Sequence, residues 1–236
     1  FRTELVEKII GFNAHAVVKP YDLPISKENL KNIELKTLSN KLLFSNSSEG
    51  VLINKDYTKG LQLRGYSING FEELDIVKNQ NFYGNRKLIS KFISIGKELS
   101  INFNINIGDK VLIMSPSGVQ TIVGNLPKQE AYIVDSIFDS GLADFDQNIA
   151  FINIKDLENL FDLDESERFL EIYLKDPKKI DFAKKKLKEI FNQEYIYTWS
   201  DLNKSLFSAL KVERNVMFII LSLIIIVAAF NIISGL

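Results

Sequence analysis

The sequence contains no cysteine, and this absence excludes three kinds of chemistry. A chain without thiols forms no disulfide, has no thiolate nucleophile and binds no metal through sulfur. Its single histidine, His15, has no serine or carboxylate at a spacing typical of a catalytic pair, so we interpret it as structural. No phosphate-binding loop of the form G-x-x-x-x-G-K followed by Ser or Thr occurs either. We therefore expect no catalytic site, no metal and no cofactor in this chain.

A strong charge of either sign is also missing, because 29 Lys and Arg oppose 30 Asp and Glu. A net charge of −1 gives no general attraction to nucleic acid, and we predict no nucleic-acid partner. Four carboxylates do gather at Asp135, Asp139, Asp144 and Asp146. Their spacing lacks the alternating ligands and the central glycine of a calcium loop, so we interpret them as a strand end and a polar loop.

One long stretch, Val216 to Leu236, has no charged side chain and the length of a membrane-spanning helix. Most of its positions are Leu, Ile, Val or Phe, which favour insertion by about 0.3 to 0.6 kcal/mol each and outweigh Ser222 and Ser234. We predict that it spans a membrane. Asn231 lies within it, and an amide at that depth usually contacts another helix, so we predict a helix-packing role for this residue.

Both ends of the sequence favour a longer parent chain. The first residue is Phe1, and no signal peptide precedes the folded part. At the other end, the apolar stretch stops at Gly235 and Leu236 without a flanking charge.

Hydrophobic periodicity predicts an α+β fold in which strands outnumber helices. The strongest predicted soluble helix begins after Asp176 and Pro177 and buries a stripe from Ile180 to Phe191. We expect turns at 46–50, 57–60 and 69–70. Other helices are expected at 1–10, 26–38 (with Leu30, Ile33 and Leu38 inward), 94–99 and 155–161, and strands at 15–19, 41–44, 50–54, 61–68, 111–114, 131–138, 149–154, 169–174 and 195–199.

The segment Pro116 to Pro127 joins two expected strands by about a dozen residues, which is long for a hairpin. A purely solvated loop would be polar throughout, but this one carries apolar side chains between prolines that restrict both ends. Apolar groups on a projecting loop indicate a binding partner. The candidate binding residues are Pro116, Val119, Ile122, Val123, Leu126 and Pro127.

Several runs resemble the LolC and LolE permease subunits of the lipoprotein-releasing ABC transporter. The resemblance is longest from Trp199 to Phe218, continued by Ala229 to Ser234. Upstream, Glu4 to His15, Ile95 to Leu99 and Ile107 to Val111 are similar to the same subunits in the same order. The resemblance therefore covers nearly the whole chain, and it implies a periplasmic domain followed by the second transmembrane helix.

The resemblance also implies a domain organisation. A mixed Porter-like subdomain, formed from both ends of the domain, would hold an inserted β-rich Sabre-like subdomain. The implied bounds are 1–72 for the first Porter-like part, 73–167 for the insert, 168–200 for the second Porter-like part, 201–215 for a juxtamembrane helix and 216–236 for the transmembrane helix. The implied location is the cell inner membrane, with residues 1–215 in the periplasm.

In this family the complex extracts acylated lipoproteins from the inner membrane and transfers them to the soluble carrier LolA. The implied partners are an ATP-binding subunit like LolD, a second permease subunit of the same or a sister type, LolA, the acylated lipoprotein and membrane lipid. ATP hydrolysis would occur in the separate subunit, so this chain is not expected to be an enzyme. The segment Pro116 to Pro127 would be the carrier-binding hook, and an acyl-binding cavity would include Phe218, Leu221, Ile225 and Phe230.

Two other classes of protein remain open from the sequence. A relative of the macrolide-exporter or cell-division type would share the fold and couple ATP use to another partner. The other class is a single-span sensor or a membrane-anchored enzyme; a sensor would continue into a signalling domain instead of two further spans.

Overall fold

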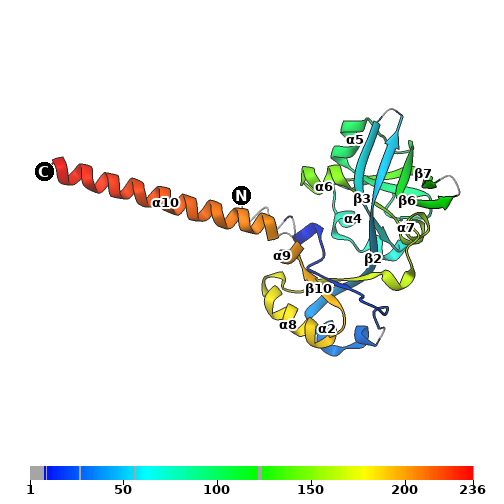
Figure 1. The fold of residues 1–236 in the computed structure, drawn as a ribbon, viewed down its shortest axis with the longest axis horizontal. Helices are drawn as coiled ribbons and strands as arrows, with labels where there is room; N and C mark the ends of the chain where they lie inside the picture. The colour runs from blue at the N-terminus through cyan, green and yellow to red at the C-terminus, as the bar shows by residue number, and fades with distance from the viewer. Residues whose placement is uncertain are drawn as a thin grey trace.

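The C-terminal stretch forms one long helix, α10 (Lys204–Gly235), which projects from a folded body in the computed structural model (Figure 1). The structure describes residues 8, 10–26, 28–55, 57–121, 124–202 and 204–235. Within α10, Val212–Ile232 has a mean hydropathy of 2.6 and is not buried against the body. This candidate span begins four residues before the predicted Val216. It therefore includes the charged Glu213 and Arg214 at the end closer to the folded body. The helix is long and apolar enough to cross a membrane.

The body is built on a ten-stranded sheet in the order β10-β1-β9-β2-β3-β8-β5-β7-β4, with β6 paired to both β2 and β7. Most pairs are antiparallel, and β3–β8 and β5–β7 are parallel. The strands are β1 (Ala16–Lys19), β2 (Ser39–Asn54), β3 (Tyr57–Tyr66), β4 (Tyr83–Gly84), β5 (Phe92–Gly96), β6 (Lys110–Thr121), β7 (Gly124–Phe138), β8 (Ile149–Asn153), β9 (Phe169–Leu174) and β10 (Tyr195–Thr198). The other α-helices whose bounds the structure describes are α2 (Ile33–Leu38), α3 (Ile68–Glu72), α4 (Asp75–Lys78), α5 (Lys97–Phe103), α6 (Ala143–Asn148), α7 (Ile154–Phe161), α8 (Ile180–Ile190) and α9 (Trp199–Leu202).

The body has two lobes, and the long strand β2 runs from the lower lobe into the upper one (Figure 1). The lower lobe contains β1, β9, β10, α2, α8 and the first half of β2, and its core includes Ala16, Leu35, Ile172 and Leu187. The upper lobe contains β5 to β8, α5 to α7 and the far half of the hairpin, and its core includes Leu52, Leu63, Ile95, Tyr132 and Leu160. A third cluster, rich in aromatic side chains, fills the region between them; its largest members are Phe12, Tyr66, Phe71, Phe138, Phe151 and Tyr173.

The predicted turn at 46–50 is wrong, because β2 runs unbroken from Ser39 to Asn54. Each residue of that segment pairs with β3, from Asn46 opposite Gly65 to Gly50 opposite Leu61. Gly50 is required by packing rather than by a turn. A Cβ at this position would lie 2.9 Å from both Leu63 Cδ1 and Phe161 Cζ, so the glycine lets α7 approach the strand.

Several predicted elements are confirmed close to their expected bounds. The helix after Asp176 begins with a short 3₁₀ turn at Pro177 and continues as α8, which buries Ile180, Ala183 and Leu187. The predicted strands at 149–154 and 169–174 form β8 and β9. The β9 strand lies inside the sheet between β1 and β2 and is buried at nearly every position.

The helix predicted over 26–38 is shorter than expected. Its first part is a 3₁₀ turn, and α2 begins only at Ile33, where the side chain of Asn32 accepts hydrogen bonds from the next backbone N–H groups. This later start rotates the helix, so that Leu35 is fully buried while Ile33, predicted to face inward, is 80% exposed. The predicted Asn69-Gly70 turn is also wrong, because both residues lie in α3, which Ser67 caps.

His15 is a buried structural residue, as predicted. Its Nδ1 accepts a hydrogen bond of 2.7 Å from the backbone N–H of Leu174, and its backbone bonds to Ile172 and Trp199. An acceptor at Nδ1 requires the neutral ring with its proton on Nε2. Burial lowers the pKa of His15 below its ordinary value of 6.5.

We expect the lower lobe to lose stability when the pH falls below about 6.5. The unfolded chain then binds a proton at His15 that the folded chain disfavours, so the stabilising contribution is complete above the unfolded pKa and declines as the pH decreases. Urea unfolding between pH 7.5 and 5.5, followed by Trp199 fluorescence, measures this. The variant His15→Asn keeps an acceptor oxygen without the titration and should give a flatter profile; an equal slope in both proteins would contradict the assignment.

Candidate functional site: the β6–β7 hairpin and the C-terminal helix

The segment Pro116 to Pro127 is the end of a β-hairpin and not the long loop that the sequence predicted. The β6 and β7 strands pair from Lys110 opposite Ile133 out to Thr121 opposite Gly124. The register shifts between Ser115 and Val119, so the prolines lie at a bulge rather than in a regular ladder. A bulge tolerates Pro116 because no ladder N–H is needed there, and it bends the hairpin locally.

The hairpin brings four of the six predicted binding residues together. Pro116 and Pro127 are exposed, the backbones of Val119 and Leu126 pair, and the Leu126 side chain is 61% exposed. Ile122 and Val123 lie outside the described residues. In Figure 1 the β6–β7 hairpin is on the side of the body opposite to α10. Whether these residues bind a partner stays a prediction.

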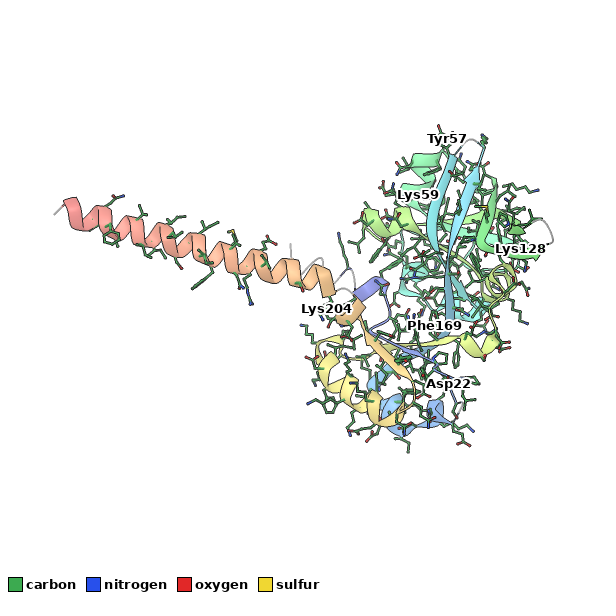
Figure 2. The ribbon with its side chains drawn as sticks, in the orientation of Figure 1. Asp22, Tyr57, Lys59, Lys128, Phe169 and Lys204 are labelled. Atoms are coloured by element: carbon green, nitrogen blue, oxygen red, sulfur yellow. The ribbon has the colours of Figure 1, made fainter. Side chains whose placement is uncertain are left out.

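The base of the hairpin is fixed to the upper lobe by side-chain contacts. Lys128 Nζ donates to the carbonyl oxygen of Asn159 and lies 2.8 Å from Asp162 Oδ1, which joins β7 to the end of α7 (Figure 2). Two residues further along β7, Glu130 forms an ion pair of 2.5 Å with Lys91, the residue before β5. The arms beyond these contacts therefore extend from a fixed base, an arrangement that sequence reasoning did not identify.

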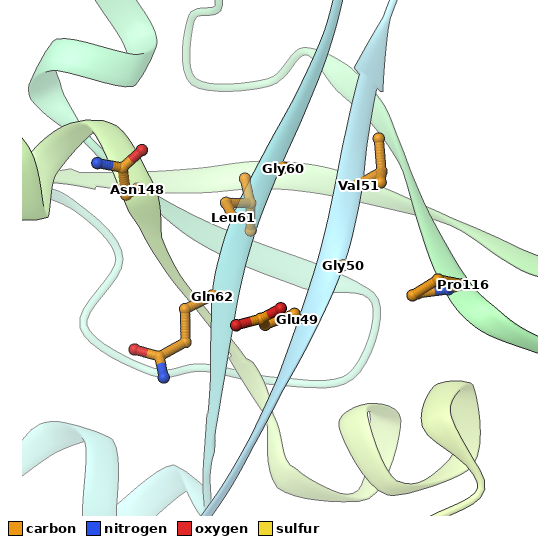
Figure 3. A pocket seen from close by; sticks show the side chains of 8 residues that line it. All are labelled: Glu49, Gly50, Val51, Gly60, Leu61, Gln62, Pro116 and Asn148. Atoms are coloured by element: carbon orange, nitrogen blue, oxygen red, sulfur yellow. The ribbon is translucent and has the colours of Figure 1, made fainter.

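A shallow groove lies beside the base of the hairpin (Figure 3). Pro116 of β6 forms one side, Asn148 at the end of α6 forms the other, and the strands of the β2–β3 hairpin lie between them. Besides Asn148, the groove has two polar side chains, Glu49 and Gln62, whose residues pair across these strands. The groove therefore runs from the bulge of the β6–β7 hairpin across strands β2 and β3.

The predicted acyl-cavity residues are all exposed on α10. Phe218, Leu221, Ile225 and Phe230 have 72%, 54%, 68% and 66% of their surface exposed. At 3.6 residues per turn the first three share one face, while Phe230 lies about 120° away from Phe218 around the helix. Asn231 is exposed as well. An acyl cavity and a helix contact both require further chains, so both roles stay predictions.

The joint between the sheet and α10 is a small polar cluster at Thr198, Asp201 and Lys184. Thr198 Oγ1 accepts from the N–H of Asp201, and Asp201 Oδ2 accepts from the N–H of Thr198 at 2.9 Å, a reciprocal cap that starts α9. Lys184 of α8 lies 2.7 Å from the same carboxylate. Burial acts to raise the pKa of Asp201, but these hydrogen bonds outweigh it and lower the pKa to about 2.

Two of the four carboxylates at 135–146, those of Asp139 and Asp146, are engaged in local contacts. Asp139 forms an ion pair of 2.9 Å with Lys97. Asp146 is buried and accepts a hydrogen bond from the backbone N–H of Ser140, and burial raises its pKa. Within the described ranges, no three His, Asp or Glu side chains are grouped so that they could hold a metal ion.

Comparison with known proteins gives sequence relatives and a structural neighbour, while no family model matches the chain. The lipoprotein-releasing system transmembrane protein LolC of Neisseria meningitidis serogroup B is 30% identical over 201 residues, which is 80% of this chain and 47% of that protein. LolC of Buchnera aphidicola subsp. Schizaphis graminum is 26% identical over 100% of this chain and 59% of its own length. The chain therefore spans about half the length of these relatives.

Among solved structures, the periplasmic region of MacB from Actinobacillus actinomycetemcomitans is similar, with a TM-score of 0.52 and 12% identity. The match covers 86% of this chain and 97% of the MacB region. At this identity the likeness shows the fold alone, a mixed α/β domain. The sequence relatives confirm the resemblance to LolC that the motifs indicated.

Proposed function

We infer that this chain, a relative of LolC permease subunits over most of its length, is the periplasmic domain and one membrane helix of an ABC transporter permease. It lies in the cell inner membrane with residues 1–215 on the periplasmic side. Its function would be to release acylated lipoproteins from that membrane to a soluble carrier. The observation that carries the proposal is an apolar, proline-bounded hairpin fixed at its base and directed away from a membrane helix.

The hairpin supplies what a carrier-docking element needs. Its base is held by Lys128, so little conformational entropy is lost when the arms are contacted. Its exposed Leu126 has no core to bury against, and apolar groups of this kind favour a partner surface. We propose that this hairpin binds a periplasmic carrier of the LolA type.

The variant Leu126→Asp should keep the fold and lose carrier binding by more than tenfold. The leucine contributes about 1.5 to 3 kcal/mol when buried, and an aspartate in its place would bring an unpaired charge into the interface. The measurement is a pull-down of the carrier from the same bacterium with the full chain in detergent. Ile33→Asp is the matched control, because Ile33 is an exposed apolar residue of the lower lobe and should bind as the unaltered protein does.

If Leu126→Asp folds by circular dichroism and binds the carrier undiminished, the carrier site lies elsewhere on the domain. Ile122→Asp and Val123→Asp, at the two positions between the described ends of β6 and β7, extend the same test. Loss of binding in these variants with retention in Leu126→Asp would restrict the contact to the tip.

The membrane helix is proposed to contribute to an acyl-binding cavity between two permease subunits. Transfer of acyl chains out of a bilayer costs about 0.8 kcal/mol per CH₂ group, so the receiving surface must be apolar and the energy must come from another source. Phe218, Leu221 and Ile225 give α10 such a face. An ATP-binding subunit like LolD is the proposed energy source, and Asn231 is proposed to contact a neighbouring helix.

The two lobes support the proposed Porter-like and Sabre-like subdomains. The lower lobe joins residues from both ends of the domain, as a Porter-like unit at 1–72 and 168–200 would, and most of the upper lobe comes from 73–167. The β2–β3 hairpin belongs to both cores, because Leu52, Leu61 and Leu63 lie in the upper one. The proposed boundary at 72 therefore assigns part of the upper core to the first segment.

A second candidate function is a subunit of the macrolide-exporter type, which the sequence left open and which would share this fold. Such a subunit would act on a different partner and would not need an apolar carrier-binding hairpin. Absence of carrier binding by the unaltered protein would support this alternative over lipoprotein release.

A further inference from the structure

A second cleft lies between the lobes and contains no residue of the β6–β7 hairpin. It opens on the face of β1 and β9 that is turned away from α8, since Val17 and Lys19 alternate with the fully buried Ala16 and Val18 of the lower core. On the other side, Asn46 and Arg64 of the β2–β3 hairpin complete it. We call this feature the junction cleft.

The cleft contains a buried hydrogen-bond donor that the described residues leave unsatisfied. Asn46 is only 2% exposed, and its Oδ1 accepts from the N–H of Ser47 at 3.0 Å, which fixes the orientation of the amide. Its Nδ2 has no hydrogen-bond partner among the described residues. A buried amide without an acceptor is destabilising, so its position in the wall of a cleft points to an acceptor that a ligand brings.

Two cations border the same cleft without a carboxylate partner in the described part of the chain. Arg64 donates to the neutral oxygens of Asn13 at 2.8 Å and Gln62 at 3.5 Å. Lys19 Nζ lies over the ring of Phe169, 4.7 Å from its centroid, and forms no ion pair that the structure describes. Both positive charges therefore remain available to a bound anion.

The one acid in the cleft, Glu171, forms no ion pair with Lys19 or Arg64 in the described part of the chain. Glu171 accepts hydrogen bonds from the hydroxyls of Ser45, Tyr66 and Tyr173 at 2.7 to 3.0 Å, and these occupy both of its oxygens. The donors that remain are an amide, a guanidinium and an ammonium group. This set is complementary to a carboxylate rather than to a cation.

The walls and the surroundings of the cleft indicate the size of the ligand. Val17, Phe169 and Tyr197 line it with apolar and aromatic surface. A neighbouring hollow shares Lys19 and Phe169 and continues to Tyr21 and Leu23, which are 64% and 72% exposed. An open surface that extends past the charged centre suits a polypeptide segment more than a small molecule.

We propose that the junction cleft binds an extended peptide segment of a partner protein in which an acidic side chain or a terminal carboxylate is flanked by apolar residues. The carboxylate would lie between Lys19 and Arg64, and a peptide acceptor would satisfy Asn46. This site is independent of the proposed function, because it uses no residue of the β6–β7 hairpin or of the membrane helix.

The test begins with a phage-displayed library of random dodecapeptides, selected on the full chain held in lipid nanodiscs. We expect enrichment of peptides that carry Asp or Glu beside aromatic or aliphatic residues. A labelled peptide from that pool should bind at least about tenfold more weakly to Lys19→Gln and to Arg64→Gln, and replacing its acid by the matching amide should weaken binding equally. Lys78→Gln, which removes an exposed charge outside the cleft, should bind as the unaltered chain does.

Two results would overturn the proposal. One is the absence of any enriched peptide, and the other is an enriched pool whose binding is unchanged in both Lys19→Gln and Arg64→Gln. Lys19 is exposed, so its variant remains informative if Arg64→Gln proves unstable. Carrier binding by the hairpin should be the same in all of these variants, which separates failure here from failure of the proposed function.

Discussion

Replacing Glu171 by leucine should lower the free energy of unfolding by about 3 to 5 kcal/mol, since three buried hydroxyls would lose their acceptor. The side chains of Ser45, Tyr66 and Tyr173 all donate to this carboxyl group, and all are at most 5% exposed. Burial and the nearby carboxyl raise the pKa of both tyrosines well above 10, so they remain donors at any working pH. Urea unfolding of the full chain in detergent, followed by Trp199 fluorescence, measures the loss.

The effect should extend across the sheet of the lower lobe because of the position of Glu171. It lies on β9, opposite Val17 of β1 and Leu43 of β2. The control is Glu171→Gln, which keeps an acceptor oxygen of the same reach and should lose less than half as much. A leucine variant within about 1 kcal/mol of the unaltered protein would mean that the three hydroxyls find other partners.

Gly96→Ala should lower the Tm by about 6 to 12 °C, which corresponds to roughly 3 kcal/mol in a chain of this size. A Cβ at Gly96 would lie 2.0 Å from the carbonyl oxygen of Asp146 and 2.4 Å from its Cα. Both are backbone atoms of α6, so no side-chain rotation relieves the overlap, and the end of β5 must separate from α6. Thermal unfolding followed by circular dichroism is the measurement.

Gly60→Ala provides the matched comparison, because a Cβ there meets no atom within 4 Å. Gly60 lies in β3, where alanine costs no strain and reduces the entropy of the unfolded chain. Its Tm should change by no more than a few degrees. Equal melting of the Gly96 and Gly60 variants would show that α6 moves aside at little cost.

Elements with strong local signals could be predicted from the sequence. The α8 helix has a cap, a proline at its start and a full apolar stripe, and α10 has an uncharged run of membrane-spanning length. The β2 strand could not be predicted in this way. Asn46 to Gly50 has the composition of a turn, and only pairing with β3 and the close approach of Phe161 hold it extended.

One of the two candidate sites could be predicted from the sequence in part, and the other could not be predicted at all. The prolines and apolar residues of 116–127 marked a binding element, but its length predicted a loop, because the shifted register that makes it a hairpin depends on both strands. The junction cleft had no signal in the sequence. Its residues Lys19, Asn46 and Arg64 belong to three strands, and only the sheet order brings them together.

The sheet order also constrains the sequence of events when the chain folds. In the lower lobe β1 lies between β9 and β10, so its partners are synthesised more than 150 residues after it. The upper lobe is complete at Phe161, and its contacts are closer along the chain. During export the upper lobe can therefore close first on the β2–β3 hairpin. The β1 strand gains its first partner only when β9, which ends at residue 174, has crossed the membrane, and its second, β10, only at residue 198. Folding of the lower lobe then coincides with arrival of the membrane helix, which places the slowest step of folding at the moment of insertion.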